Sequence, residues 1–227
     1  MMLVVLSHPL GPDTPNWPGA PNLEMRPFHS MSGGDIANTH VLEVYNHQGT
    51  HVDAPSHVNP EGATLSDLSP EYFVFERPLV VDLPLTDRQL IRPEDLDAYA
   101  GGPDQPDLII FRSGFEAVRE DRTRYEKEGP GFSAAAVRRL REDFPGLRAV
   151  AMDWLSLAAY SAVEEGMEAH RELLGRGRGD RFVLIFEDVR VSGLEGRRPV
   201  RVVCTPLFAD GLDGSPCTVL TEVSQEV

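Results

Sequence analysis

The sequence of 227 residues is poor in cysteine and has no long apolar run. Its two cysteines, Cys204 and Cys217, form no CxxC pair, which argues against a disulfide framework and against a thiolate zinc site. No stretch approaches the roughly 20 apolar residues that span a bilayer, and the N-terminal MMLVVLSHPL lacks the basic start of a signal peptide. We therefore expect buried free cysteines, no membrane partner and a cytoplasmic location.

Positive charge is also scarce. The net charge is -15 and the pI is about 4.8, so a nucleic acid would meet a repulsive field, and we expect no such partner. The chain has no GxSxG elbow, no P-loop and no HExxH motif. GRGRGD at 175–180 superficially resembles a phosphate loop, but it follows a predicted helix and precedes a predicted strand. That order favours a helix-ending loop.

The hydrophobic pattern is mixed α/β. Helical periodicity is clearest at 133–143, where Ser133 is a good N-cap, and at 161–174. Residues 11–34 are rich in Pro and Gly and predict an arm or long loop. No repeat or linker divides the chain, so we predict one domain, 1–227. Strands are predicted at 39–46, 79–85, 107–113, 149–153, 181–188 and 200–208.

Residues 47–57 read HQGTHVDAPSH and contain three of the seven histidines. A helix would bring His47 and His51 together at i and i+4, but Gly49 and Pro55 argue against a helix here. In a flat strand the two Cα atoms would lie about 13 Å apart, which is barely compatible with one shared ion. Some feature must shorten the path between them.

Gly49 can provide it, because glycine tolerates a tight bend. Asp53 follows His51 by two residues, on the same face at a spacing of roughly 7 Å. His57 lies beyond a proline that redirects the chain, so it can approach an ion without ligating it. The run therefore predicts three metal ligands, His47, His51 and Asp53, and one base, His57.

Two alternatives stay open for this run. It could be a cluster of polar residues in a surface turn, or a purely structural metal site. Structural zinc usually takes four closed ligands, often with cysteine, whereas two histidines and one carboxylate leave positions free for water and substrate. The donor set therefore favours a catalytic site.

Further ligands must come from elsewhere in the chain. Glu187 ends the apolar run FVLIFE, where an isolated carboxylate is costly unless it is paired or bound to metal. His170 shares a face of the predicted 161–174 helix with Met167 and Leu174. Taken alone, each has a simpler explanation, as a satisfied carboxylate at a strand end and as a hydrogen-bonded core histidine.

HQGTHVDAPSH matches the signature HxGTHxDxPxH and resembles the metal-dependent cyclase family, which includes bacterial kynurenine formamidases, isatin hydrolases and some polyketide cyclases. SHPL, NWPG, FRSGF, AHRELL and FED resemble other parts of that family. The resemblance implies a single α/β swivelling domain of β/β/α type with a β-barrel-like core. It also implies a homodimer or homotetramer in which arms such as the one around Trp17 help to build a neighbour's substrate pocket.

The resemblance further implies roles for the residues singled out above. His47, His51 and Asp53 would bind a first metal ion, His170 and Glu187 would complete a two-metal cluster, and His57 would transfer protons. Zn²⁺ suits these ligands best, as one or two ions, and Mn²⁺ is the alternative.

The expected reaction is hydrolysis of the amide bond in a small N-formyl aryl amine, as in tryptophan catabolism, through a metal-activated water. Hydrolysis of an isatin-type or lactone ring, a polyketide cyclase reaction and a catalytically silent metal-binding protein are the alternatives. The silent reading rests on two departures from the family pattern, Ala158 in place of an acid and Thr218 in place of a frequent arginine.

Overall fold

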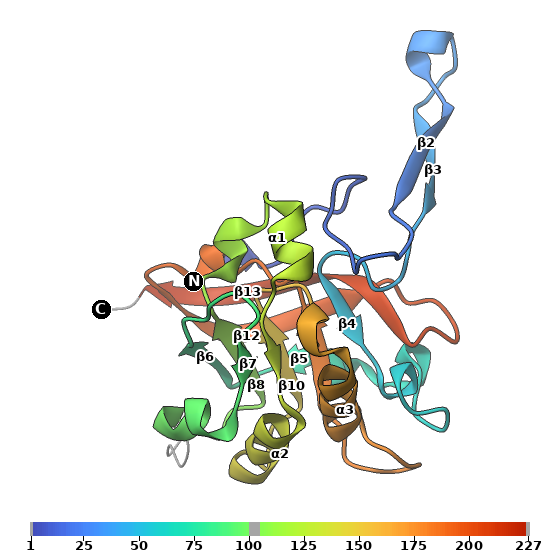
Figure 1. The fold of residues 1–227 in the computed structure, drawn as a ribbon. Coiled ribbons are helices and arrows are strands. Elements are labelled where there is room, and N and C mark those ends of the chain that lie inside the picture. The colour runs from blue at the N-terminus through green and yellow to red at the C-terminus, as the bar shows by residue number, and fades with distance from the viewer. Residues whose placement is uncertain (1, 100–104, 226–227) are drawn as a thin grey trace.

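The apolar runs of the sequence form the parallel half of a nine-stranded sheet (Figure 1). The computed structural model describes residues 2–99 and 105–225. Strands β6 (Pro78–Asp82), β8 (Leu108–Arg112), β10 (Ala149–Met152) and β11 (Leu184–Glu187) lie side by side in this order. Both faces of this half are covered, which explains why the strands read as continuous apolar runs.

The other half of the sheet is antiparallel. It consists of β4 (His51–Asp53), β13 (Gly214–Gln225), β12 (Arg197–Pro206) and β5 (Val74–Phe75), and β1 (Met2–Val5) also pairs with β13. β4 joins the two halves, because it pairs with β11 on its other side. β5 and β6 stand at opposite ends of the strand order, yet only two residues separate them in sequence, so the sheet must curl round. The predicted α/β fold with a barrel-like core is confirmed.

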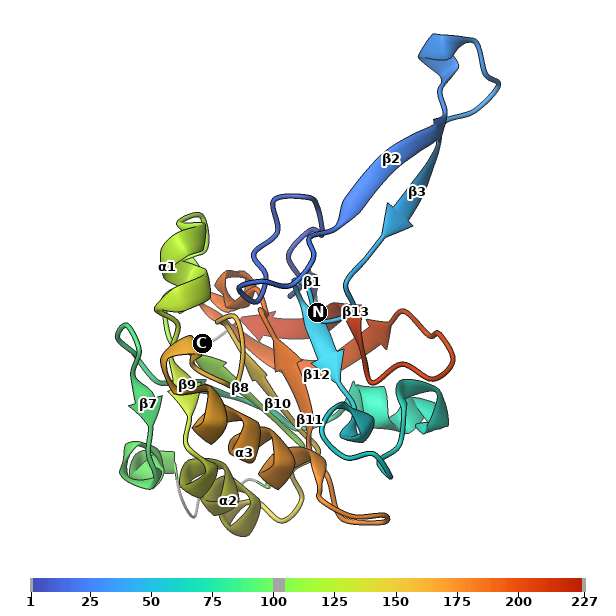
Figure 2. The same ribbon diagram turned by 45° about the vertical axis from the view of Figure 1, so that its right-hand side comes forward.

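Helices α2 (Ala134–Asp143) and α3 (Val163–Leu174) pack against each other on one face of the sheet (Figure 2). Ser133 caps α2 as predicted, since its hydroxyl accepts a hydrogen bond from the backbone N–H of Ala136. α3 ends at Gly175, whose φ is +87°, and GRGRGD connects α3 to β11, as the order of elements predicted. Among the described residues no helix is long and apolar enough to cross a bilayer.

A two-stranded ribbon projects from the rest of the molecule (Figures 1 and 2). It consists of β2 (Glu24–His29) and β3 (Thr39–Glu43), and every residue of both strands is exposed. The predicted strand at 39–46 is therefore real, but it belongs to this arm and ends before the histidine motif. The predicted loop at 11–34 contains the missed strand β2.

Other elements were not predicted from the sequence. They include β1, β13, the short helix α1 (Arg122–Lys127) and the paired strands β7 (Leu90–Ile91) and β9 (Gly131–Phe132). Short 3₁₀ turns lie at Met31–Gly33, Pro55–His57, Leu65–Asp67, Pro70–Phe73, Pro93–Tyr99, Phe115–Val118, Tyr160–Ala162 and Val191–Leu194.

The contact between α3 and the segment after β10 requires a glycine at position 166. A Cβ built there would overlap both the Cβ and the Cα of Ala158. We expect Gly166→Ala to lower the free energy of unfolding by about 1–3 kcal/mol, because the backbone of Ala158 cannot yield cheaply. The direction of this change in stability is informative, because helix propensity alone would make the alanine variant more stable by about 1 kcal/mol.

Urea unfolding of the purified variant measures this effect. Gly11→Ala is the matched control, because no atom lies within 4 Å of a Cβ at that position, and its stability should stay within about 0.5 kcal/mol of the parent. A Gly166→Ala variant that is more stable than the parent would contradict the packing argument.

Candidate metal centre

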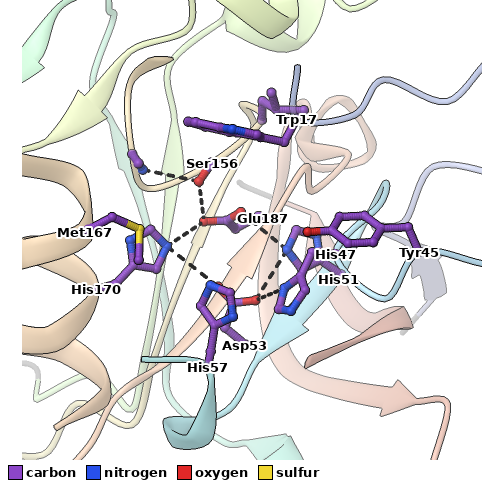
Figure 3. Close-up of a pocket in the computed structure, with 12 residues that line it drawn as sticks. Trp17, Tyr45, His47, His51, Asp53, His57, Ser156, Met167, His170 and Glu187 are labelled. Carbon is purple, nitrogen blue, oxygen red and sulfur yellow. Dashed lines mark hydrogen bonds and ion pairs between the residues drawn. The ribbon is translucent and has the colours of Figure 1, made fainter. Parts of the chain in front are cut away.

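Strand pairing brings the first part of the site together. His51 and Asp53 lie two residues apart on β4, so their side chains share one face of the sheet. Glu187 stands directly opposite His51 in the β4–β11 register, and α3 covers this face and contributes His170 (Figure 3). Two segments more than a hundred residues apart in sequence thus meet in one pocket.

His47 reaches the same place through a bend at Gly49. Residues 46–50 form turns and bends rather than strand, and the φ of Gly49 is +68°. A Cβ at Gly49 would lie 2.9 Å from Cγ2 of Thr14 and 3.1 Å from Cδ1 of Leu10, so both the backbone angle and the space favour glycine. The predicted shortening of the path between His47 and His51 is confirmed.

The centre of the cluster consists of two buried carboxylates, each lying between imidazoles. Nε2 of His51 lies 3.4 Å from Oδ1 of Asp53 and 3.3 Å from Oε2 of Glu187. Nε2 of His170 lies 3.5 Å from Oε1 of Glu187 and 3.8 Å from Oδ2 of Asp53. None of these four residues is more than 4% exposed.

The remaining ring nitrogens show what such a cluster can hold. Nδ1 of His51 lies 2.8 Å from the carbonyl of Gly49, and Nδ1 of His170 lies 2.7 Å from the carbonyl of Gly166. A carbonyl only accepts, so each Nδ1 donates, and in the neutral ring Nε2 directs a lone pair at the carboxylates. A lone pair and a carboxylate repel unless a proton or a cation lies between them. Histidines that bind metal are usually oriented in this way.

Asp213, a residue that sequence reasoning missed, plays the corresponding part for His47. Nδ1 of His47 lies 2.8 Å from Oδ1 of Asp53, and its Nε2 lies 3.0 Å from Oδ2 of Asp213. The same Asp213 oxygen lies 3.0 Å from Nδ1 of His57. These hydrogen bonds from His47 and His57 outweigh burial and hold the pKa of Asp213 well below its usual range.

Charge in the cluster is balanced by protons when no cation is present. Burial alone would lower the pKa of His47, but the charge of Asp53 and hydrogen bonds with Asp213 and Asp53 raise it to about 9. Burial and the charge of Asp53 oppose ionisation of Glu187, but interactions with His170 and His51 lower its pKa to about 2. A divalent cation can take the place of these protons, so the donor set fits a metal ion.

The structure brings together all six residues predicted for the centre. Two sets that share Asp53 have ligand atoms within 4.8 Å of one another: His47, Asp53 and His57, and His51, Asp53 and Glu187. His57 is thus close enough to act as a ligand as well as a base. Its role in proton transfer, like the ligand role of the other five residues, stays a prediction.

The cluster lies in a pocket of about 220 Å³. Trp17 lines this pocket of its own chain, whereas the resemblance implied a neighbour's pocket, and Leu155 and Met167 are among the apolar walls (Figure 3). Its role in substrate binding stays a prediction. Of the two departures from the family pattern, Ala158 also lines the pocket, whereas Thr218 is exposed on β13. Only the first can act directly on the substrate space.

Comparison with known proteins agrees with the fold and the motif. The sequence model of the Cyclase family, described as "Putative cyclase", matches residues 4–159, so the chain belongs to that family. Cyclase-like protein 1 of Arabidopsis thaliana is 29% identical over 224 residues, covering 93% of this chain and 81% of the relative. The resemblance inferred from the motif is confirmed.

Two solved structures share the fold. Isatin hydrolase A from Labrenzia aggregata, bound to benzyl benzoate, has a TM-score of 0.77 at 21% identity and covers 99% of this chain and 94% of its own. An isatin hydrolase bound to the product analogue thioisatinate has a TM-score of 0.81 at 17% identity and covers 99% of this chain and 92% of its own.

Metal binding should compete with protons at His47. Because its pKa is about 9, His47 is protonated at pH 7 in the metal-free protein and must lose that proton to ligate an ion. We expect the affinity for Zn²⁺ to rise from pH 6 to pH 8, by up to about tenfold per unit for one displaced proton. Calorimetric titration in buffers of different ionisation enthalpy counts the protons released.

His47→Gln should lower the number of protons released by about one, because the pKa values of His51 and His170 are also raised and these residues still release theirs. His40→Gln, an exposed change on β3, should leave the number unchanged. An affinity that does not change between pH 6 and pH 8 would show that His47 takes no part in metal binding.

Proposed function

We propose that this protein is a metal-dependent hydrolase that cleaves the amide bond of a small N-formyl aryl amine. The observation that carries the proposal is the cluster of buried carboxylates and histidines in a pocket of about 220 Å³ with apolar walls. The fold neighbours named as isatin hydrolases support hydrolysis in general.

The five predicted ligands would hold one or two divalent ions, Zn²⁺ first and Mn²⁺ as the alternative. They are His47, His51, Asp53, His170 and Glu187. A bound ion supplies Lewis acidity, which lowers the pKa of water toward about 7 and polarises a carbonyl group. The outer hydrogen bonds to Gly49, Gly166 and Asp213 orient the three imidazoles before any ion arrives.

His57 is the proton carrier in this proposal. It lines the pocket with its side chain 24% exposed, and histidine is the side chain best suited to exchange protons near neutral pH. It takes a proton from the attacking water and returns one to the leaving amine. Such a role requires that the pocket-facing ring nitrogen be free of hydrogen when the reaction begins.

The apolar side of the pocket holds the aryl group. Trp17 lies at the top of the pocket in Figure 3 and Met167 at its left, and Leu155 adds a third apolar surface. The ring of Trp17 is itself supported by an edge contact with Tyr160, with ring centroids 5.6 Å apart. These side chains exclude water around the scissile bond, and the reaction takes place at the cluster of carboxylates and histidines.

Other functions could use the same cluster of buried carboxylates and histidines. The isatin hydrolase fold neighbours favour hydrolysis of an isatin-type ring, with a lactone ring as a variant of that proposal, and the family name favours a cyclase reaction, for which a polyketide is the substrate we propose. A catalytically silent metal-binding protein is the third possibility, and it rests on Ala158, which lines the pocket at a position where the family pattern implied an acid.

The projecting arm supports assembly into a homodimer or homotetramer. An isolated two-stranded ribbon is marginally stable in water, yet this one exposes several large apolar side chains. They are Met25, Phe28, Met31, Ile36 and Leu42. A second copy of the chain would bury them, and Trp17, which lines the pocket, precedes the arm by only a few residues.

A substrate panel with metal analysis tests the function. N-formylkynurenine or a formanilide should be hydrolysed, and activity should be lost on chelation and return with Zn²⁺ or Mn²⁺.

Variants separate the metal ligands from the proton carrier. Asp53→Asn should lose the metal, because it removes the carboxylate shared by both ligand sets. His57→Gln should keep the metal and lower kcat by about 10²–10⁴-fold. His29→Gln on the exposed arm is the matched control.

The panel separates the alternatives. Turnover of isatin alone would favour the ring hydrolase, and bound metal with no turnover would favour the silent protein or a cyclase. Full activity in metal-free protein would end the metal-dependent mechanism.

Replacing the apolar residues of the arm should weaken assembly. We expect the double variant Phe28→Asp with Leu42→Asp to shift the protein toward monomer in sedimentation velocity at micromolar concentration, because two charges then oppose burial of the ribbon. Glu24→Gln, also exposed on β2, should leave the oligomeric state unchanged. A parent protein that is monomeric throughout this range would refute the assembly proposal.

A further inference from the structure

Asp213 connects the candidate metal centre to the proposed proton carrier. Its Oδ2 lies 3.0 Å from Nε2 of His47 and 3.0 Å from Nδ1 of His57. One carboxylate oxygen thus faces two imidazoles, whose ring centroids lie only 4.2 Å apart. A carboxylate accepts and does not donate, so both nitrogens must carry hydrogen.

The position of Asp213 is itself fixed by its neighbours. Nδ2 of Asn46 donates to Oδ1 of Asp213 at 2.8 Å and to the carbonyl of Gly214 at 3.2 Å. A Cβ built at Gly214 would overlap Cε1 of His47, so the loop before β13 and the turn before β4 fit together only with glycine there. The carboxylate is therefore held in place by contacts on both of its oxygens.

We infer that Asp213 is a positioning residue that fixes the tautomer of His57, an inference that rests on the proposed function of this site. With its hydrogen on Nδ1, neutral His57 presents a bare Nε2, which has no hydrogen-bond partner among residues 2–99 and 105–225. Nε2 is then the atom that can accept a proton in the pocket. The same carboxylate orients His47 toward Asp53, so the proton carrier and a metal ligand share one support.

Loss of the carboxylate frees both rings. Without an acceptor at Nδ1, His57 can carry its hydrogen on Nε2 instead, and the pocket-facing nitrogen can no longer take a proton. Loss of the correct tautomer costs about 10⁴-fold in kcat in a Ser-His-Asp triad, and loss of an outer partner of a metal-bound histidine costs about 10–100-fold in metal affinity or activity. Asp213 is partly exposed, at 39%, so the smaller effect is the better guide here.

Nitrogen NMR of the imidazoles in Zn²⁺-loaded protein tests the inference directly. In the parent, His57 should show the tautomer with hydrogen on Nδ1, and His57→Gln assigns its signals by removing them. In Asp213→Asn the hydrogen should move to Nε2 or exchange between the two nitrogens. With saturating Zn²⁺, kcat should fall by about 10–100-fold while KM changes by less than about threefold.

Asp210→Asn is the matched control, because it makes the same charge change three residues away, where Asp210 accepts only from Ser66 in the described structure. It should preserve both the tautomer and kcat. Asp213→Ala is a second variant, since truncation of a partly exposed side chain on a loop leaves little buried space. An unchanged His57 tautomer in both Asp213 variants would overturn the inference, whatever happens to metal affinity.

The two proposals can fail separately. If the parent hydrolyses none of the substrates, the proposed function fails, but the NMR measurement still decides whether Asp213 sets the tautomer of His57. If the parent is active and the variants keep both tautomer and kcat, only the role of Asp213 is lost.

Discussion

The burial of two carboxylates side by side is the constraint on which the rest of the structure depends. Asp53 and Glu187 lie on neighbouring strands, and neither is more than 4% exposed. Removing one ion from water costs several kcal/mol. Oxygens of the two carboxylates lie within 4.8 Å of each other, and two like charges at this distance repel strongly. Positive charge must therefore be present, as protons on the histidines or as a metal ion. The parallel sheet, the short strand β4 and the covering helix α3 together deliver this arrangement of charges.

A third buried carboxylate, that of Asp188, helps to fix the ends of β4 and β11. Asp188 follows Glu187 directly but faces the other way, with φ at +52° and no exposed surface. Arg119 binds it with two hydrogen bonds of 2.8 and 2.6 Å, and the hydroxyl of Tyr125 donates to it at 2.6 Å. Thr50, the residue before β4, donates to the carbonyl of Asp188 at 2.6 Å. The ends of β4 and β11 are thus tied together, so the two strands present their ligands at a fixed spacing.

The sequence predicted those parts of the fold and site that local patterns encode. Continuous apolar runs identified the parallel strands, and Gly49 predicted the bend that brings the motif together. β13 escaped detection because Pro216 interrupts its pattern, and proline argues against a strand when its partners are unknown. Asp213 was missed for a different reason. Its position beside His57 follows from the pairing of β13 with β4, and no pattern within its own loop reports that pairing.

The packing of α3 links ligand geometry to substrate space. The carbonyl of Gly166 accepts from Nδ1 of His170, and the same glycine lets α3 lie against Ala158, which lines the pocket. A larger side chain at 158 would need space that α3 occupies, so it would move the helix and with it His170. The small size of Ala158 therefore helps to fix the position of α3, and through it the position of His170 in the metal centre. An acid at position 158 would change the pocket wall and the place of His170 together, so the substrate space and the metal centre of this chain are coupled through α3.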